Sequence, residues 1–153
     1  MKPEDSEAFI PYRMKRAEES LRAAEIMYEK DMLSFSMNRI YYSMFYAVQA
    51  ALILKGVSFS KHGQVKAYLN RELVKTGIIP ISLGRIYNKA FEYRQKFDYL
   101  DFAEPDQDLV ESYLKEARVF LDGKKNIFKI PLKNKDYSKL YILCSLRHAL
   151  MLA

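Results

Sequence analysis

Apolar residues recur at spacings of three and four positions through most of the first 123 residues, which is the pattern of amphipathic helices. In residues 3–29 the repeating positions form one stripe, made of Met14, Ala17, Leu21, Ala24 and Tyr28. The pattern therefore predicts a helix over 3–29. We expect Pro11 to separate a short leading turn from the main helix, because proline cannot donate the backbone hydrogen bond of a helix interior.

The second predicted helix covers about residues 34–55 and is apolar on nearly all sides from Ile40 to Leu54. A helix of this kind lies at the centre of its fold or is shared with a partner subunit. Gly56 follows it, and glycine is the usual residue in the left-handed conformation that ends a helix. We therefore expect a central helix that ends at Gly56.

A third helix is predicted over about residues 62–75, ending at Gly77, and a fourth follows Pro80. Ser82 is a candidate N-cap of the fourth helix, because a serine hydroxyl can accept a hydrogen bond from a free backbone N–H at a helix start. The apolar stripe of the fourth helix consists of Leu83, Ile86, Ala90, Tyr93, Phe97 and Leu100.

A fifth helix is predicted to start at Glu104-Pro105-Asp106, because proline is favoured in the first turn, and to end at Gly123. Its core face consists of Val110, Tyr113, Leu114, Ala117, Phe120 and Leu121. No segment alternates with the period of a strand. The predicted fold class is all-α, an up-and-down bundle of four or five helices with short loops.

The charge divides the chain into two parts. Residues 124–153 contain seven of the 25 basic residues and one of the 19 acidic residues, so the 18 basic and 18 acidic residues of 1–123 cancel. We expect a helical domain over 1–123, then a basic linker and a short C-terminal helix of unknown role over 124–153. A nucleic acid bound to the domain would need a local basic patch.

Several classes of protein are disfavoured by composition. Cys144 is the single cysteine, which fits a reducing, cytoplasmic setting, and no apolar run approaches the roughly 20 residues that span a bilayer. The two histidines, His62 and His148, are far apart, and the sequence has no CxxC, HExxH or phosphate-binding loop motif. We therefore predict no metal site, no cofactor and no membrane segment.

Two stretches carry candidate chemistry. In the second helix, Asn38, Arg39, Tyr42 and Tyr46 share a face, and either Asn38 or Arg39 is a candidate hydrogen-bond partner for the Tyr42 hydroxyl. Most of the neighbouring aromatic residues are interpreted as core.

The second stretch is FEYRQKFDYLDF, residues 91–102, in which Arg94 and Asp98 are four positions apart and can pair on a helix. We expect Arg94 to lie half-buried at the shoulder of the core stripe. A half-buried arginine is rarely unpaired. Two interpretations follow: the ion pair closes the edge of the bundle, or Arg94 is held ready to bind a phosphate.

Taken together, NRIYYSMFYAVQAALILKG, SKHGQVKAYLNRELVKTG and FEYRQKFDY resemble the HEPN family (higher eukaryotes and prokaryotes nucleotide-binding). The similarity covers roughly residues 8–122. It implies an all-α bundle, commonly an antiparallel homodimer. Many members are metal-independent endoribonucleases, many act with a minimal nucleotidyltransferase as a toxin–antitoxin pair, and others are non-catalytic binding modules.

The ribonuclease members of that family carry an arginine followed, after four to six residues, by a histidine. Arg94 matches the arginine, but positions 99, 100 and 101 are Tyr, Leu and Asp. Histidine suits proton transfer near neutral pH, whereas Asp98 is normally ionised and Tyr99 normally protonated. His62 is a candidate to supply the missing imidazole from a different part of the chain.

Three functional hypotheses remain open. The first is a binding module, in which a homodimer binds a nucleotide, an RNA or a nucleotidyltransferase through a cleft containing Arg94; its binding residues would be Arg39, Tyr42, His62 and Lys96. The second is a metal-independent endoribonuclease that uses Arg94 with Asp98 or Tyr99. The third is a helical oligomerisation module in which the Arg94–Asp98 pair is purely structural.

Overall fold

The computed structural model describes residues 3–123, with side chains from residue 8 onward. These residues form an all-α structure, as predicted. Its helices are α1 (Pro3–Glu29), α2 (Leu33–Leu54), α3 (His62–Tyr68), η1 (a π-helix, Leu69–Val74), α4 (Ile81–Tyr99) and α5 (Gln107–Asp122). The predicted linker and helix of 124–153 lie outside the described residues.

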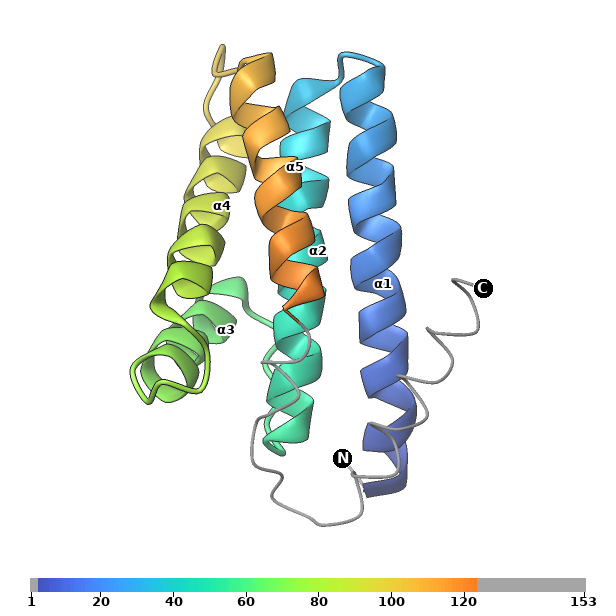
Figure 1. Ribbon diagram of the computed structural model, residues 1–153, viewed down its shortest axis with the longest axis vertical. Coiled ribbons are helices and arrows are strands. Elements are labelled where there is room, and N and C mark those ends of the chain that lie inside the picture. The colour runs from blue at the N-terminus through green and yellow to red at the C-terminus, as the bar shows by residue number, and fades with distance from the viewer. Residues whose placement is uncertain (1–2, 124–153) are drawn as a thin grey trace.

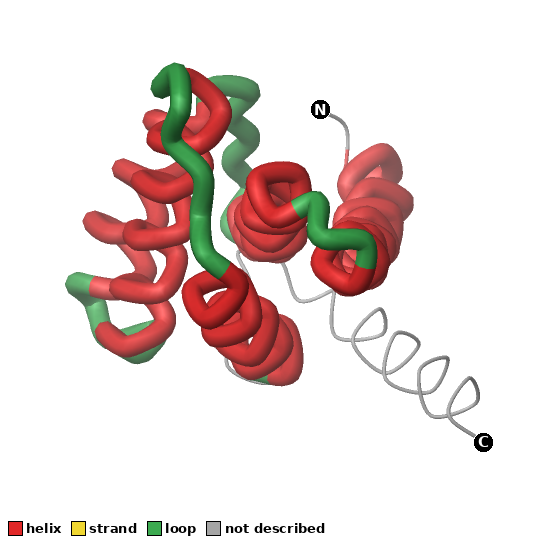
Figure 2. Tube along the Cα trace, turned by 90° about the horizontal axis from the view of Figure 1, so that it is seen from above, coloured by secondary structure: helices red, strands yellow, loops and turns green. Residues whose placement is uncertain are grey.

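The four long helices run up and down beside one another, and α3 with η1 lies beside the lower part of α4 (Figure 1). Seen from above, the helices lie beside one another as a bundle (Figure 2). The central position predicted for α2 is confirmed, because this helix packs against α1, α4 and α5. Gly56 adopts a φ of +73°, so the left-handed residue expected after α2 is also confirmed.

The interface of α1 and α2 includes small buried residues and a side-chain hydrogen bond. Ala17 and Ala24 of α1 and Ala47 of α2 are fully buried, and such residues let helices approach closely. The Ser36 hydroxyl donates to the Ala24 carbonyl at 2.8 Å, which satisfies a buried polar group and joins the two helices.

Pro11 does not interrupt the first helix, so that part of the prediction was wrong: α1 runs without a break through it. Proline already has a helical φ, and it removes one backbone hydrogen bond without requiring the chain to turn. Ile10 and Met14, on either side of Pro11, are both buried in the core. Their packing holds the two sides in one helix.

The third helix changes type where the sequence predicted a continuous α-helix. After Tyr68 the chain forms the π-helix η1, in which the Lys75 N–H donates to the Asn70 carbonyl at 2.9 Å. The Asn70 side chain bonds the Lys66 carbonyl at 2.8 Å and pairs with Asn88 of α4 at 2.9 Å. These amide contacts fix η1 against α4 and favour the wider turn.

The fourth helix is rotated relative to the prediction. Ser82 lies inside α4, which is preceded by Pro80 with no side-chain cap. Of the predicted stripe, Leu83 and Ala90 are buried, but Leu100 is 59% exposed beyond the end of the helix. The buried positions are Leu83, Gly84, Tyr87, Ala90 and Arg94. Arg94 therefore belongs to the buried face itself rather than to its shoulder.

The rotation of α4 follows from how its aromatic side chains pack. The Tyr87 and Phe91 rings each lie 5.8 Å from the Tyr41 ring of α2, which turns this flank of α4 towards the central helix. Tyr93 is only partly buried and packs edge-on against Tyr113 of α5 at 5.2 Å. Spacing alone identifies an apolar stripe, but it cannot show which neighbouring aromatic flank faces the core.

The fifth helix starts at Gln107 rather than in the Glu104-Pro105-Asp106 turn. Asp106 is its N-cap, and the carboxylate accepts a hydrogen bond from the Leu109 N–H at 2.8 Å. Pro105 thus precedes the helix. The buried residues of α5 are Val110, Ala117, Phe120 and Leu121, all of which were predicted as core.

Candidate functional site

Arg94 lies at the centre of the candidate site, where α4 faces α2. It is 8% exposed, and its Nη2 donates to the Tyr99 hydroxyl at 3.1 Å. The guanidinium carbon lies 5.5 Å from the centre of the Tyr41 ring and 5.7 Å from that of Tyr42. The cation is therefore held among electron-rich ring faces, which stabilise it with little water.

The predicted ion pair between Arg94 and Asp98 is present, with Nε 3.2 Å from Oδ2. The two side chains are 10% and 21% exposed, so the pair is largely shielded. The Nε–H is nevertheless buried without a well-aligned hydrogen bond. The 3.2 Å contact does not count as a hydrogen bond because the carboxylate oxygen lies away from the direction in which the Nε–H points. Arg94 thus keeps a donor that a small movement of Asp98, or an incoming anion that displaces Asp98, can satisfy.

A polar chain connects Asp98 to α2. The Asn38 amide donates to Asp98 Oδ2 at 2.7 Å, and the Asn38 oxygen accepts from Arg39 Nη2 at 2.7 Å and from Nε at 3.1 Å. Asn38 therefore joins the carboxylate on α4 to a second guanidinium. Asp98 therefore receives contacts from two sides, from Arg94 on its own helix and from Asn38 on α2.

Tyr42 lies between the two guanidinium groups. The Arg39 guanidinium carbon is 4.7 Å from the centre of the ring, close enough for a cation–π contact. The hydrogen bond predicted from Asn38 or Arg39 to the Tyr42 hydroxyl was wrong, because Asn38 bonds Asp98 and Arg39 bonds Asn38. The hydrogen bonds of Asn38 and Arg39 lie within the polar chain instead.

His62, the first residue of α3, lies close to this cluster, although it is 32 positions before Arg94 in the sequence. Its Nδ1 is 2.9 Å from the Tyr41 hydroxyl, and its ring lies 4.3 Å from that of Phe45. The pKa of His62 is lowered from its ordinary value, first by burial and then by the charge of Arg94. The neutral imidazole is therefore favoured beside the buried arginine.

Two buried tyrosines link these groups. The hydroxyls of Tyr41 and Tyr87 lie 3.4 Å apart, and both residues are fully buried. Burial raises the pKa of Tyr41 to about 12 and that of Tyr87 well above its ordinary value. Both phenols stay protonated near neutral pH. One hydroxyl can therefore serve as a hydrogen-bond donor to the neutral His62 ring.

The structure separates Lys96 from the other predicted binding residues. Lys96 is exposed on α4, with its ammonium 5.4 Å from the centre of the Phe97 ring. A lysine that the sequence interpretation missed lies nearer: Lys66 of α3 is 4.5 Å from the Phe91 ring, which itself contacts Tyr41. The four-residue spacing of His62 and Lys66 on one helix was the signal that pointed to it.

The comparisons with known proteins agree with this architecture. Residues 10–127 match the HEPN domain. The chain belongs to the HEPN domain family. It is 40% identical over 125 residues to a Thermotoga maritima protein named "UPF0332 protein", covering 82% of this chain and 95% of that protein.

Two related proteins of Methanocaldococcus jannaschii carry the name "Putative toxin". One is 36% identical over 112 residues, covering 73% of this chain and 76% of that protein. The other is 34% identical over 113 residues, covering 74% and 84%. In this HEPN domain, no group of three His, Cys, Asp or Glu side chains within the described residues is placed to hold a metal ion. The described helices also include none that is long and apolar enough to cross a membrane.

The lowered pKa of His62 predicts a pH dependence of stability. In the unfolded chain the imidazole titrates near its ordinary value of 6.5, above its folded pKa. As the pH falls below 6.5, the unfolded state binds the additional proton first, so the free energy of unfolding decreases until the pH passes below the folded pKa. NMR titration is expected to show a His62 pKa below 6.5 that rises in Arg94→Met. A pKa at or above 6.5 in the wild type would contradict this account.

Proposed function

We propose that this HEPN-domain protein binds the phosphates of a nucleotide or an RNA through Arg94 and Arg39, and acts as the toxin-like partner of a minimal nucleotidyltransferase. The observation that supports it best is the buried Arg94 with one donor unsatisfied, beside a second guanidinium on the same polar chain. Guanidinium groups fit phosphate oxygens in pairs.

A surface at one end of the bundle supports the protein partner. Tyr99, Leu100 and Phe102 are 68%, 59% and 105% exposed at the end of α4 and in the loop after it. We call these three residues the end patch. Segment 98–108 has five acidic residues and no lysine or arginine. A protein with an apolar, basic surface fits this acidic segment.

Among the residues of the end patch, Phe102 gives the strongest support for a protein partner. It is a bulky residue with a φ of +60°, a conformation that costs roughly 1–2 kcal/mol for a residue with a side chain at Cβ. We expect Phe102→Asn to raise the free energy of unfolding of the protein alone by about 0.5–1 kcal/mol, because asparagine tolerates this conformation and no buried area is lost. Urea denaturation measures this change. Unchanged or lower stability would contradict the expected relief of strain.

The same variant tests the end patch. Co-expression of the protein with the nucleotidyltransferase encoded beside its gene is expected to yield a complex with wild type and much less with Phe102→Asn. Phe9→Asn, which changes a partly exposed phenylalanine on α1, is the control and should keep the complex. A complex that survives Phe102→Asn would place the partner elsewhere.

Binding of nucleic acid is tested on Arg39, whose loss leaves the buried Arg94 in place. We expect Arg39→Gln to weaken binding of single-stranded RNA roughly tenfold and to lower the slope of log K against log salt by about 0.7, because one phosphate contact is lost. Arg85→Gln, on an exposed position of α4, is the matched control. Equal RNA binding by both variants and the wild type would show that Arg39 does not contact the RNA.

A metal-independent ribonuclease is the second candidate, and the proximity of His62 to Arg94 favours it. A neutral imidazole can accept a proton near neutral pH, as a general base must. Cleavage of structured RNA in the presence of a chelator, lost in His62→Gln and in Arg94→Lys, is the expected result under this mechanism. Absence of cleavage by the wild type would rule out the ribonuclease and leave binding as the only proposed role.

A further inference from the structure

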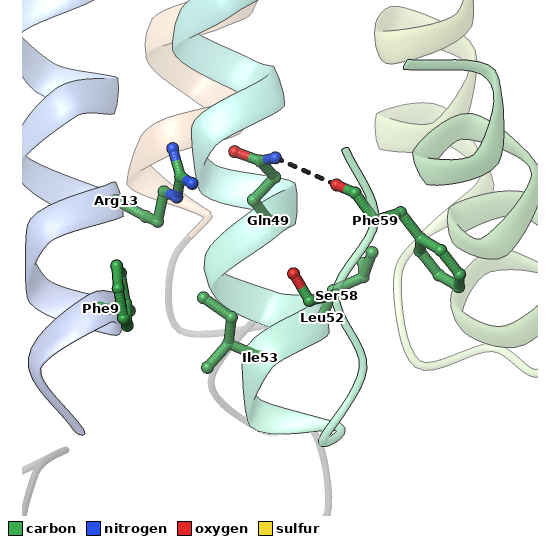
Figure 3. Close-up of a pocket in the computed structure, with 7 residues that line it drawn as sticks. All are labelled: Phe9, Arg13, Gln49, Leu52, Ile53, Ser58 and Phe59. Carbon is green, nitrogen blue, oxygen red and sulfur yellow. Dashed lines mark hydrogen bonds between the residues drawn. The ribbon is translucent and has the colours of Figure 1, made fainter. Parts of the chain in front are cut away.

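Gln49 and His62 each use only one of their two polar side-chain atoms in a hydrogen bond. Gln49 lines a cavity between α1, α2 and the loop after α2 (Figure 3). Its Nε2 donates to the Phe59 carbonyl at 3.4 Å, whereas its Oε1 is buried and accepts no hydrogen bond. A molecule in this cavity cannot reach the buried oxygen. His62, beside Arg94, differs in that its second nitrogen is accessible.

The two ring nitrogens of His62 have different surroundings. Nδ1 lies 2.9 Å from the Tyr41 hydroxyl. Nε2 makes no hydrogen bond within the described residues and is not a buried atom, so a ligand can reach it. The His62 ring lies 5.5 Å from the Tyr42 ring, and the guanidinium carbon of Arg94 lies 5.7 Å from the centre of the same ring. Nε2 is therefore the atom that His62 can offer to a ligand of the Arg94 site.

A neutral imidazole carries one ring proton, and the buried hydroxyls beside His62 determine which nitrogen holds it. Tyr41 and Tyr87 are both fully buried, and within the described residues Tyr41 is the only hydrogen-bond partner of the Tyr87 hydroxyl. If Tyr41 donates to Nδ1, Tyr87 donates to Tyr41 and both hydroxyl protons are bonded. If Nδ1–H donates to Tyr41 instead, the Tyr41 proton turns to Tyr87, and the Tyr87 proton is buried without an acceptor. The first arrangement is favoured, because an unpaired buried donor costs stability.

We propose that Tyr41 fixes the neutral His62 ring in the tautomer that carries its proton on Nε2, so that His62 donates a hydrogen bond to an anion held by Arg94. The use of this donor rests on the proposed function, in which the anion is a phosphate. Tyr41 is then a positioning residue that acts through His62. In this tautomer the free lone pair belongs to Nδ1 and is occupied by Tyr41, so Nε2 cannot act as a general base. A ribonuclease that used His62 as its base would require the opposite tautomer.

Nitrogen NMR of the full chain, isotopically labelled in its histidine rings, tests the tautomer without any ligand. The spectrum is recorded at mildly alkaline pH, where the imidazole is neutral, and the signals lost in His62→Gln separate His62 from His148. Protonated and unprotonated ring nitrogens resonate in different ranges, so the two tautomers are distinguished directly. We expect a protonated Nε2 and an unprotonated Nδ1 in His62. A protonated Nδ1, or a mixture of the two tautomers, would overturn the inference.

Tyr41→Phe and Tyr87→Phe are a matched pair of variants, because each removes one buried hydroxyl from the same hydrogen-bonded chain. Tyr41→Phe removes the donor to Nδ1, so both tautomers of His62 should be detected. In Tyr87→Phe the Tyr41 hydroxyl still has Nδ1 as its acceptor, so the single tautomer should remain. A single, unchanged tautomer in Tyr41→Phe would refute the role of Tyr41. The wild-type spectrum tests the inference even if Tyr41→Phe fails to fold.

Titration with single-stranded RNA tests whether the Nε2 donor is used. Glutamine has an N–H donor but cannot act as a base, so His62→Gln should keep most of the RNA affinity, whereas His62→Met should weaken it roughly fivefold. Equal affinity of His62→Met and the wild type would refute the donor role of His62. If the wild type has a protonated Nε2 but binds no RNA, the tautomer stands and the proposed function fails. If it binds RNA but has a protonated Nδ1, the tautomer fails and the proposed function stands.

Discussion

Replacing Arg94 with alanine is expected to lower the free energy of unfolding by about 3 kcal/mol and to reduce RNA affinity roughly 100-fold. The stability loss follows from burial: Arg94 is 8% exposed, and its truncation leaves a void beside Tyr41 and Tyr42. It also leaves the shielded Asp98 carboxylate without its cation. Asp98 retains the Asn38 hydrogen bond and some solvent, which keeps the loss at the lower end of the range for buried pairs.

Two measurements separate structure from binding in this variant. Urea denaturation gives the stability change, and RNA titration is made at a temperature at which the variant remains folded. Arg94→Lys is the matched control for charge: it should recover part of the stability but little of the affinity, because lysine cannot make two parallel contacts to a phosphate. If Arg94→Ala loses stability but binds RNA as wild type does, Arg94 has a structural role only. This is the result expected for a helical oligomerisation module.

Replacing Tyr41 with alanine is expected to destabilise the protein by about 4 kcal/mol, the largest single effect that we predict. Tyr41 is fully buried, and its ring lies between 5.5 and 5.8 Å from five other rings. Its removal opens a cavity where α2, α3 and α4 meet. It also removes the face on which the Arg94 guanidinium lies.

Tyr41→Phe divides this effect between packing and hydrogen bonding. The ring remains, and only the contacts of the hydroxyl with His62 and Tyr87 are lost, so we expect a cost of about 1–2 kcal/mol. Tyr12→Ala, on an exposed position of α1, is the control and should change stability by less than about 1 kcal/mol. Equal losses for Tyr41→Phe and Tyr41→Ala would contradict the packing account.

The homodimer, the cytoplasmic setting and the domain boundary at residue 123 stay predictions, as does the role of the basic segment 124–153. The resemblance implies the dimer, and sedimentation of the full chain tests it. An antiparallel dimer that brings two Arg94 side chains to one cleft would double the local positive charge available to an RNA.

The helices of this protein and the pairing of Arg94 with Asp98 were determined by the sequence itself. Spacings of three and four specify a helical face, and positions four apart on one helix meet wherever that helix lies. The all-apolar run in α2 likewise required a central position. These are local properties, which depend only on residues within a few helical turns of one another.

The tertiary structure alone decided which residues gather around Arg94. The rotation of α4 depended on the packing of Tyr87 and Phe91 against Tyr41. His62 approached the arginine because the loop after α2 brings the start of α3 back to the same side. Such contacts join residues distant in sequence, and their free energy depends on how whole helices pack rather than on any local pattern.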